Sequence, residues 1–189
     1  MEAFARENNI PVILRDTRAY LENLCGNLRP KRILEVGTAI GYSISCMLRA
    51  CDANATCMEA SMPNIKLARQ NLEVLGLTPR VNIVVGDCLK TLPGLNGEKF
   101  DLIFLDGPKG KYLEILDLLL PLLDNNGVLV ADNVLFRGMV EGETPIPEPR
   151  FVPTVEVLRT FIDRLQRDPR FITTVHHIGD GLCEVRYKN

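Results

Sequence analysis

Short runs of Val, Ile and Leu alternate with amphipathic stretches along most of the chain. Five hydrophobic runs cover Arg32–Gly37, Ala55–Ala60, Val81–Asp87, Phe100–Gly107 and Gly127–Asn133. Continuous apolarity is typical of strands buried on both faces, and strands that alternate with helices form parallel sheets through right-handed crossovers. The pattern therefore predicts an α/β fold with a mostly parallel sheet.

Helices are expected between and after these strands, at Gly41–Ala50, Pro63–Leu75, Lys111–Leu123 and Thr154–Arg167. A proline such as Pro63 suits the first turn of a helix, where its missing N–H would have no partner, and Gly76 suits the position just beyond a helix end. The segment Glu141–Pro153 contains four prolines. It is expected to be a loop, either a lid over a site or a plain connection.

The C-terminal part of the sequence departs from this alternation. Two strand-like segments, Phe171–Ile178 and Leu182–Lys188, are separated by Gly179-Asp180-Gly181. Glycine and aspartate between two strands are typical of a tight turn. The sequence therefore predicts an antiparallel β-hairpin that completes the sheet, an arrangement known from the Rossmann-like methyltransferase fold.

Length and charge limit the classes of protein that need to be considered. Residues 1–189 fit a single domain, and 22 basic against 24 acidic residues give no overall electrostatic footprint for nucleic acid, although a local basic patch stays possible. The polar start MEAFARENNIP is unlike a secretory signal, and no apolar run is long enough for a bilayer, so a cytoplasmic location is expected. The six cysteines form no C-x-x-C pair, which argues against zinc and disulfide frameworks.

Polar side chains follow two of the predicted strands. Asp106 and Lys109 lie in LDGPKG after one strand, and Asp132 and Asn133 end the next. The carboxyl ends of parallel strands share one edge of a sheet, where ligands bind. Mg²⁺ prefers carboxylate and amide oxygens, so these two aspartates and the asparagine can hold a divalent cation while the lysine serves as a base. Taken one at a time, the same residues also fit a solvated loop cation and a strand-ending turn.

A second group of residues suggests a nucleotide-like ligand. The loop after the first strand contains Gly37 and Gly41 but lacks the middle glycine of the phosphate-binding G-x-G-x-x-G pattern. Glu59 ends the second strand and can accept hydrogen bonds from ribose hydroxyls, and an adenine can rest near Asp87 after the third. An acidic rim of Glu35, Glu59 and Asp87 suits a ligand without phosphates, such as the positively charged S-adenosylmethionine. Singly, Glu35 and Asp87 also fit loop-capping roles.

These motifs resemble the metal-dependent class I O-methyltransferases, typified by catechol and caffeoyl-coenzyme A methyltransferases. The matching segments are NIPVI (9–13), LEVGTAIGYS (34–43), MEA (58–60), FDLIFLDGPKGKY (100–112), GVLVADNVLFRG (127–138) and IGDGL (178–182). DNVLFRG together with IGDGL is particularly similar to the bacterial branch, some of whose members methylate 5-hydroxyuridine at the wobble position of tRNA. The resemblance covers nearly the whole chain.

The resemblance implies a seven-stranded Rossmann-like sheet, a homodimer, and S-adenosylmethionine with Mg²⁺ (or Mn²⁺ or Ca²⁺) as cofactors. It also assigns the site residues: cofactor contacts by Val12, Gly37, Ser43, Glu59, Asp87, Cys88 and Asp106; metal ligation by Asp106, Asp132 and Asn133; and general base catalysis by Lys109. The expected acceptor is an acidic hydroxyl, either of tRNA wobble 5-hydroxyuridine or of a small catechol-like molecule.

Two features of the sequence differ from many of these relatives. It contains no tryptophan, the residue with which the catechol enzymes wall their substrate, and it begins close to the NIPVI segment. A catechol acceptor is therefore less well supported, and part of the N-terminal helix that many relatives place over the active site is expected to be missing. Arg137 is a candidate for substrate contact, whereas Lys111 fits an ordinary charged rim.

Two functions of other classes stay open at this point. A nicotinamide-dependent oxidoreductase would need a phosphate-cradling glycine loop, which this sequence lacks. A nucleotide-binding module without catalysis would bind S-adenosylmethionine but show no metal-dependent turnover. His176 and His177 lie on a predicted strand and are expected to be structural or exposed rather than catalytic.

Overall fold

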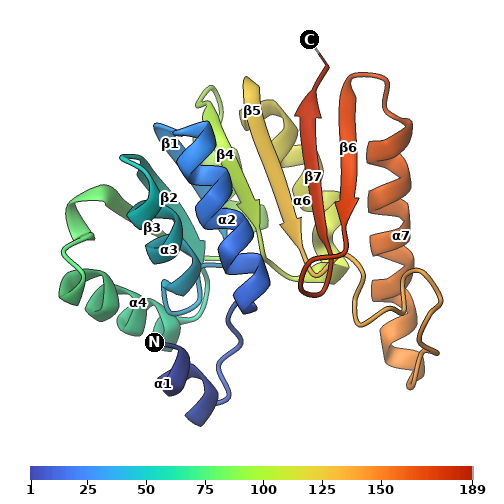
Figure 1. The fold of residues 1–189 in the computed structure, drawn as a ribbon, viewed down its shortest axis with the longest axis horizontal. Coiled ribbons are helices and arrows are strands. Elements are labelled where there is room, and N and C mark those ends of the chain that lie inside the picture. Colours follow the sequence, from blue (N-terminus) through green and yellow to red (C-terminus); the bar gives the residue numbers. More distant parts are fainter. Residues whose placement is uncertain (189) are drawn as a thin grey trace.

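A computed structural model describes residues 1–188 as a twisted sheet with helices on both faces (Figure 1). The helices are α1 (Glu2–Glu7), α2 (Arg15–Leu28), α3 (Tyr42–Ala50), α4 (Met62–Val74), α5 (Cys88–Thr91), α6 (Tyr112–Leu119) and α7 (Val152–Arg167). The strands are β1 (Arg32–Val36), β2 (Asn54–Glu59), β3 (Val81–Val85), β4 (Phe100–Leu105), β5 (Leu123–Asp132), β6 (Phe171–His176) and β7 (Leu182–Tyr187).

The seven strands form one sheet in the order β3-β2-β1-β4-β5-β7-β6. All neighbours pair in parallel except β7, which runs antiparallel to both β5 and β6. The predicted Rossmann-like methyltransferase fold, with a mostly parallel sheet and a C-terminal antiparallel hairpin, is confirmed. The apolar runs of β1, β4 and β5 lie inside the sheet and are buried on both faces, whereas β3 is an edge strand and is only partly buried.

Two hydrophobic clusters cover the two faces of the sheet. One cluster joins the sheet to α2, α3 and α4 through residues such as Leu21, Met47 and Leu72. The other joins it to α6 and α7 through residues such as Ile115 and Leu158. Figure 1 shows α2 and α3 in front of the sheet and α6 behind it. The sheet is thereby held between helical layers, and its strand ends are left for binding.

Several element boundaries differ from those the sequence predicts. The helix expected at Lys111–Leu123 ends at Leu119, continues as a 3₁₀ turn, and gives way to β5 at Leu123 rather than Gly127. Helix α7 begins at Val152 instead of Thr154, after a 3₁₀ turn at Pro149–Phe151, and so shortens the loop expected at 141–153. Helices α1 and α2 were not predicted. The N-cap of α2 is Leu14, which offers no side-chain oxygen as a start signal.

The register of the sheet brings three polar loops to one edge. Val36 of β1 pairs with Leu105 of β4, which pairs with Ala131 of β5. The next residue in each strand direction is therefore Gly37, Asp106 or Asp132. Because β7 runs the opposite way, the turn between β6 and β7 also lies at this edge, at the bottom of Figure 1.

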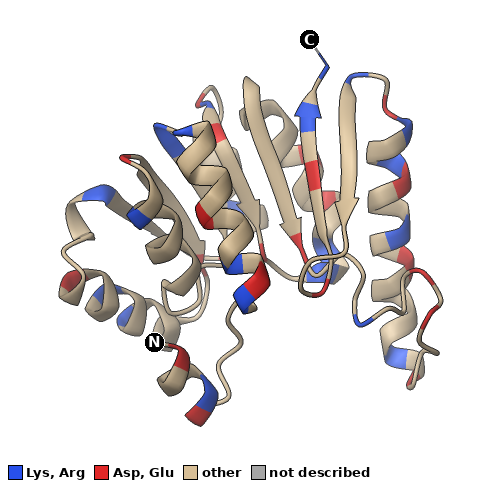
Figure 2. Ribbon diagram, in the orientation of Figure 1, with Lys and Arg blue, Asp and Glu red and all other residues tan. Residues whose placement is uncertain are grey.

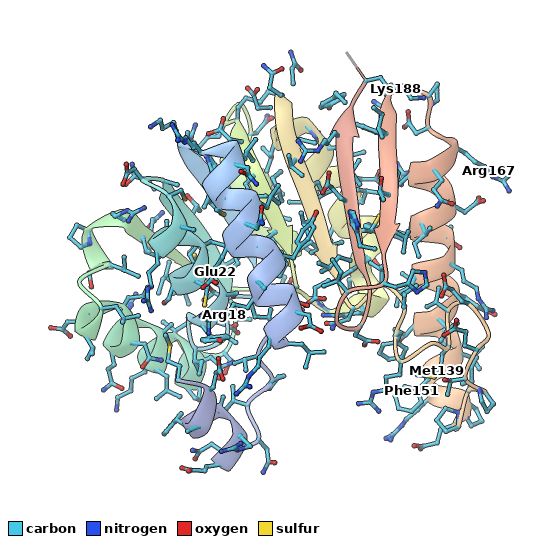
Figure 3. All side chains as sticks on the ribbon, in the orientation of Figure 1. Arg18, Glu22, Met139, Phe151, Arg167 and Lys188 are labelled. Carbon is cyan, nitrogen blue, oxygen red and sulfur yellow. The ribbon has the colours of Figure 1, made fainter. Side chains whose placement is uncertain are left out.

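Charged residues are spread over the helices and loops rather than separated into acidic and basic elements (Figure 2). On α2, Arg18 donates to Glu22 at 3.0 Å and approaches the Tyr42 hydroxyl of α3 at 3.5 Å. Figure 3 shows Arg18 and Glu22 on the side of α2 that faces α3. Arg18 also pairs with Glu2 at 3.3 Å, which ties α1 to both helices. Within residues 1–188, none of the helices has the length and apolar character needed to cross a membrane.

Candidate active site

A cavity of about 810 Å³ opens at the carboxyl ends of β1, β4 and β5. The segment Pro11–Leu14, which leads from α1 into α2, forms one wall, and the β6–β7 turn forms another. Most of the remaining wall comes from the loops after the strands: Gly37, Ala39, Glu59, Asn64, Asp106, Gly107, Pro108, Lys109, Asp132, Asn133 and Arg137. The residues proposed for metal and base are thus gathered in one cavity.

Two aspartates lie deep in this cavity. Asp132 is 1% exposed, and burial raises its pKa to about 7, with a further increase from the neighbouring Asp106. Burial also raises the pKa of Asp106, although the Lys109 ammonium opposes that rise. Each carboxylate is therefore destabilised as an anion by burial, and a bound cation would relieve this cost.

Lys109 is held against Asp106. Its Nζ lies 2.5 Å from Asp106 Oδ1, and both side chains are largely buried. The ammonium also lies 5.7 Å from the centre of the Tyr112 ring. These contacts place Lys109 beside the proposed metal ligands and not in solvent, so the interpretation as a freely solvated loop cation does not describe it.

Tyr112 connects the carboxyl ends of β4 and β5 through hydrogen bonds from its hydroxyl. Its side chain is fully buried, and its hydroxyl lies 3.1 Å from the Leu105 carbonyl and 3.0 Å from the Asp132 carbonyl. Burial raises the pKa of the Tyr112 phenol well above its usual value, so it remains a hydrogen-bond donor. The sequence motif contained this tyrosine, but nothing in its spacing indicated that it joins β4 to β5.

Asn133 adopts the left-handed region, with φ of +57°. Asparagine tolerates this conformation better than most non-glycine residues. Its backbone N–H donates to Asp132 Oδ1 at 2.7 Å. No hydrogen bond is found for its side-chain amide within the described part of the chain. The Asn133 amide is therefore available to a ligand in the cavity that both residues line.

Gly37 lies where two loops come into van der Waals contact. Its φ is +94°, and a Cβ at this position would stand 2.3 Å from the Asp106 carbonyl oxygen. Only glycine combines this backbone conformation with that approach. The loop after β1 and the loop after β4 are thereby packed backbone to backbone at the cavity floor.

We expect Gly37→Ala to separate these loops and to weaken S-adenosylmethionine binding at least about tenfold, since a left-handed non-glycine residue alone costs ~1–2 kcal/mol. Calorimetric titration with the cofactor measures the effect. Gly26→Ala is the matched control, because a Cβ there meets nothing within 4 Å. Equal affinity of the Gly37 variant and the wild type would contradict the expectation.

A second cavity of about 330 Å³ adjoins the first and shares Gly37, Glu59, Gly107 and Pro108 with it. Its other walls include Val36, Met58, Ala60, Gly86, Asp87, Cys88, Leu89 and Lys111. The mixture of apolar side chains and one or two carboxylates is typical of a site for a nucleoside. Four of the residues expected to contact the cofactor, Gly37, Glu59, Asp87 and Cys88, are therefore grouped here, beside the residues proposed for metal and base.

Glu59 and Asp87 each accept backbone hydrogen bonds. Glu59 accepts from the N–H groups of Ala39 and Ser61, both at 2.8 Å. Asp87 accepts from the Leu89 N–H at 3.0 Å and so caps the short helix α5. Both residues still line the cavities, so the capping role and a ligand-binding role are compatible for each.

Glu35 and Ser43 do not lie where the sequence analysis expected them, at the wall of a ligand site. Glu35 does not belong to an acidic rim, because it is fully buried and accepts hydrogen bonds from the Thr38 and Ser43 hydroxyls. Burial raises the pKa of Glu35 to about 7, against the lowering effect of these hydrogen bonds. Ser43 is itself buried and lines neither cavity. In this structure the pair fixes the fold of the loop after β1 from inside.

Other expected residues are found as follows. Val12 lines the first cavity and Cys88 the second. All six cysteines are free thiols. Residues 141–153 line neither cavity. His176 and His177 also lie outside both cavities, and their imidazoles approach Glu184 and Glu141 respectively.

Asp180 is a cavity residue that the sequence did not single out. It lies in the β6–β7 turn and lines the first cavity, and its negative charge contributes to the raised pKa of Asp132. The only sequence signal was its place in the IGDGL segment, where Gly-Asp-Gly predicts a turn without predicting what the aspartate faces.

The O-methyltransferase family profile matches residues 4–188, nearly the whole chain. The chain belongs to the O-methyltransferase family. A catechol O-methyltransferase of Mycobacterium tuberculosis is 33% identical to it over 127 residues, which are 66% of this chain and 58% of that protein. The alignment thus spans less than two thirds of that relative's own length.

Solved structures of similar proteins share the fold of this O-methyltransferase. A Staphylococcus aureus protein assigned to the caffeoyl-CoA O-methyltransferases superposes with a TM-score of 0.92 at 29% identity, covering 99% of this chain and 90% of that chain. The Podospora anserina methyltransferase PaMTH1, solved with S-adenosylhomocysteine bound, gives 0.84 at 30% identity, covering 94% and 80%. Membership of the O-methyltransferases, inferred from the motifs, is thereby confirmed, whereas metal dependence and the tRNA branch are not distinguished by these matches.

Proposed function

We propose that this O-methyltransferase transfers a methyl group from S-adenosylmethionine to an acidic hydroxyl with the help of a divalent cation. The observation that supports this most directly is the convergence of Asp106, Asp132, Asn133 and Lys109 on one cavity that adjoins a nucleoside-sized cavity. This convergence supports a proposal in which metal ligands, base and cofactor pocket meet at one edge of the sheet.

The residues fit S-adenosylmethionine by shape and charge. The smaller cavity offers apolar walls for an adenine, with Cys88 and Met58 among them, and Glu59 stands where the two cavities meet. The larger cavity is lined by four carboxylates and only two basic side chains. An excess of carboxylates favours a cationic ligand such as a sulfonium and disfavours a polyphosphate. This argues against a nicotinamide dinucleotide.

The residues also fit a hard divalent cation. The donors are two carboxylates and one amide, all oxygen ligands of the kind that Mg²⁺ prefers. No cluster of three or more His, Cys, Asp or Glu residues was found among residues 1–188, so a softer metal with several imidazole or thiolate ligands is not supported there. Mg²⁺ commonly uses only one or two carboxylates and completes its shell with water or substrate oxygens.

The proposed roles of the side chains follow from this arrangement. A divalent cation, when bound, supplies the positive charge that stabilises the acceptor hydroxyl as its anion. Asp132 at the end of β5 and Asn133 after it would hold that cation together with Asp106, which would also contact the cofactor. Lys109 takes or relays the acceptor proton at Nζ. Tyr112 keeps the β4 and β5 ends at a fixed separation, which in-line methyl transfer requires.

The acceptor is proposed from the motifs. An oxygen beside the reacting hydroxyl would let either tRNA wobble 5-hydroxyuridine or a catechol-like molecule chelate the cation. DNVLFRG and IGDGL favour the tRNA substrate, and the absence of tryptophan in the sequence supports the same choice. Catechol O-methyltransferase is the name of the mycobacterial relative, which keeps the small-molecule acceptor as the second candidate. Homodimer formation belongs to the same proposal and is measured by light scattering.

The proposal is tested by incubating the protein with methyl-labelled S-adenosylmethionine, Mg²⁺ and either tRNA containing wobble 5-hydroxyuridine or a panel of catechols. We expect label in one of the two acceptors, and digestion with mass analysis then identifies the methylated atom. A protein that binds S-adenosylmethionine but labels neither acceptor under these conditions would refute both proposed acceptors.

A further inference from the structure

The β6–β7 turn is hydrogen-bonded to the loop that follows Asp132 and Asn133. The N–H groups of Val134 and Leu135 donate to the carbonyls of Gly181 and Asp180 at 3.0 and 3.1 Å. The N–H of Arg137 donates to the Asp180 side chain, at 2.5 Å from Oδ1. Asp180 therefore fixes this loop with both its backbone and its carboxylate.

The loop held in this way has an uncommon backbone conformation. Phe136, Arg137 and Gly138 follow one another with φ of +47°, +60° and +76°. Side chains other than glycine rarely adopt this region, and residues that do so need support from their surroundings. The charge-assisted hydrogen bond from the Arg137 N–H to Asp180 gives that support at the middle of these three residues.

The Arg137 side chain is exposed and lines the 810 Å³ cavity. Within residues 1–188, no ion pair or side-chain hydrogen bond of its guanidinium is found. The other basic residue of the cavity wall, Lys109, is already paired with Asp106. Among the described residues of this wall, Arg137 is thus the cation whose charge is available to an incoming ligand.

We propose that Arg137 forms an anion subsite for the methyl acceptor and that Asp180 is the positioning residue that presents it. The subsite would bind a carboxylate or a phosphate carried by the same molecule as the reacting hydroxyl. A guanidinium suits such groups because its planar donors can bind two oxygens at once. This inference rests on the proposed function, since it assigns the substrate class of the same cavity.

The first test measures binding, so that it does not depend on turnover. Protein loaded with S-adenosylhomocysteine and Mg²⁺ is titrated with two matched pairs: 5-hydroxyuridine 5′-monophosphate against 5-hydroxyuridine, and 3,4-dihydroxybenzoate against 3,4-dihydroxybenzamide. We expect the anionic member of at least one pair to bind about tenfold more tightly than the neutral one, the effect of one charge-assisted contact. The pair that shows the preference identifies the anion as phosphate or carboxylate.

The preference should disappear in Arg137→Gln. It should persist in Arg167→Gln, whose side chain is 80% exposed and pairs with Asp163 at the far end of α7 (Figure 3). Equal affinity within both pairs, absence of binding by all four compounds, or a preference that survives in Arg137→Gln would overturn the proposal. Methyl transfer without any charge preference would refute the subsite alone, whereas a charge preference without transfer would refute the proposed function alone.

The role of Asp180 is tested separately. Asp180→Ala removes the acceptor of the Arg137 N–H, and we expect it to raise KM for the anionic acceptor about tenfold more than KM for the neutral one. Asp180→Asn keeps an oxygen at the same place and should restore the preference. A purely structural role would instead lower kcat with both acceptors alike. Either that result or an unchanged KM in Asp180→Ala would show that Asp180 does not position Arg137.

Discussion

Replacement of Lys109 by methionine is expected to lower kcat by about 10²- to 10⁴-fold, the usual contribution of a general base, while S-adenosylmethionine binding is preserved. Methionine is unbranched like lysine and only one atom shorter, but it cannot accept a proton. Lys109 lies against Asp106 and outside the apolar walls of the smaller cavity, so the adenosine part of the cofactor should not respond to the change.

Single-turnover kinetics and calorimetry with S-adenosylhomocysteine separate the two effects. Lys66→Met is the matched control, because Lys66 is exposed on α4 and lines neither cavity. A Lys109 variant with wild-type turnover would show that the lysine is only a partner of Asp106 and not part of the chemistry.

Removal of divalent cations is expected to lower methyl transfer at least about 100-fold, because stabilising the acceptor anion is worth several kcal/mol. Addition of Mg²⁺ or Mn²⁺ should restore it. The reason is structural: Asp106 and Asp132 are both buried, burial raises the pKa of each, and the single lysine beside them pairs with only one.

A measurement without turnover complements this one. Mg²⁺ should raise the melting temperature of the wild type by mass action and should do so much less in Asp132→Asn, which keeps the shape of the side chain but loses its charge. Transfer that is indifferent to chelators, together with equal Mg²⁺ stabilisation of both proteins, would refute the metal proposal. Lysine and the adjacent cavity would then have to activate the hydroxyl alone.

The five parallel strands were predictable because each coincides with a hydrophobic run, and β6 and β7 because a Gly-Asp-Gly turn separates them. The site followed from the parallel strands because polar residues at their carboxyl ends share one edge of the sheet. The part of β5 at 123–126 was missed since Asp124-Asn125-Asn126-Gly127 has the composition of a turn. Helix α2 was missed because Leu14 supplies no capping oxygen. In both places tertiary contacts override the local signal.

Prediction of the site residues from the sequence failed for a different reason. Glu35 and Glu59 are the same residue type at the ends of neighbouring strands, yet only Glu59 reaches the cavity, while Glu35 is satisfied by two hydroxyls inside the fold. Sequence spacing does not report which side chains satisfy one another. Asp180 is separated from Arg137 by 43 positions, and their contact depends on where β7 inserts in the sheet.

That insertion has a consequence for biosynthesis. Strand β7 lies between β5 and β6 but leaves the ribosome after all the other strands of the sheet. Until it emerges, the outer edge of β5 has no partner, and the loop with Arg137 lacks the turn that holds it. A nascent chain therefore exposes an unpaired apolar edge, which favours association with other chains, and cannot complete its acceptor pocket before translation has passed Tyr187.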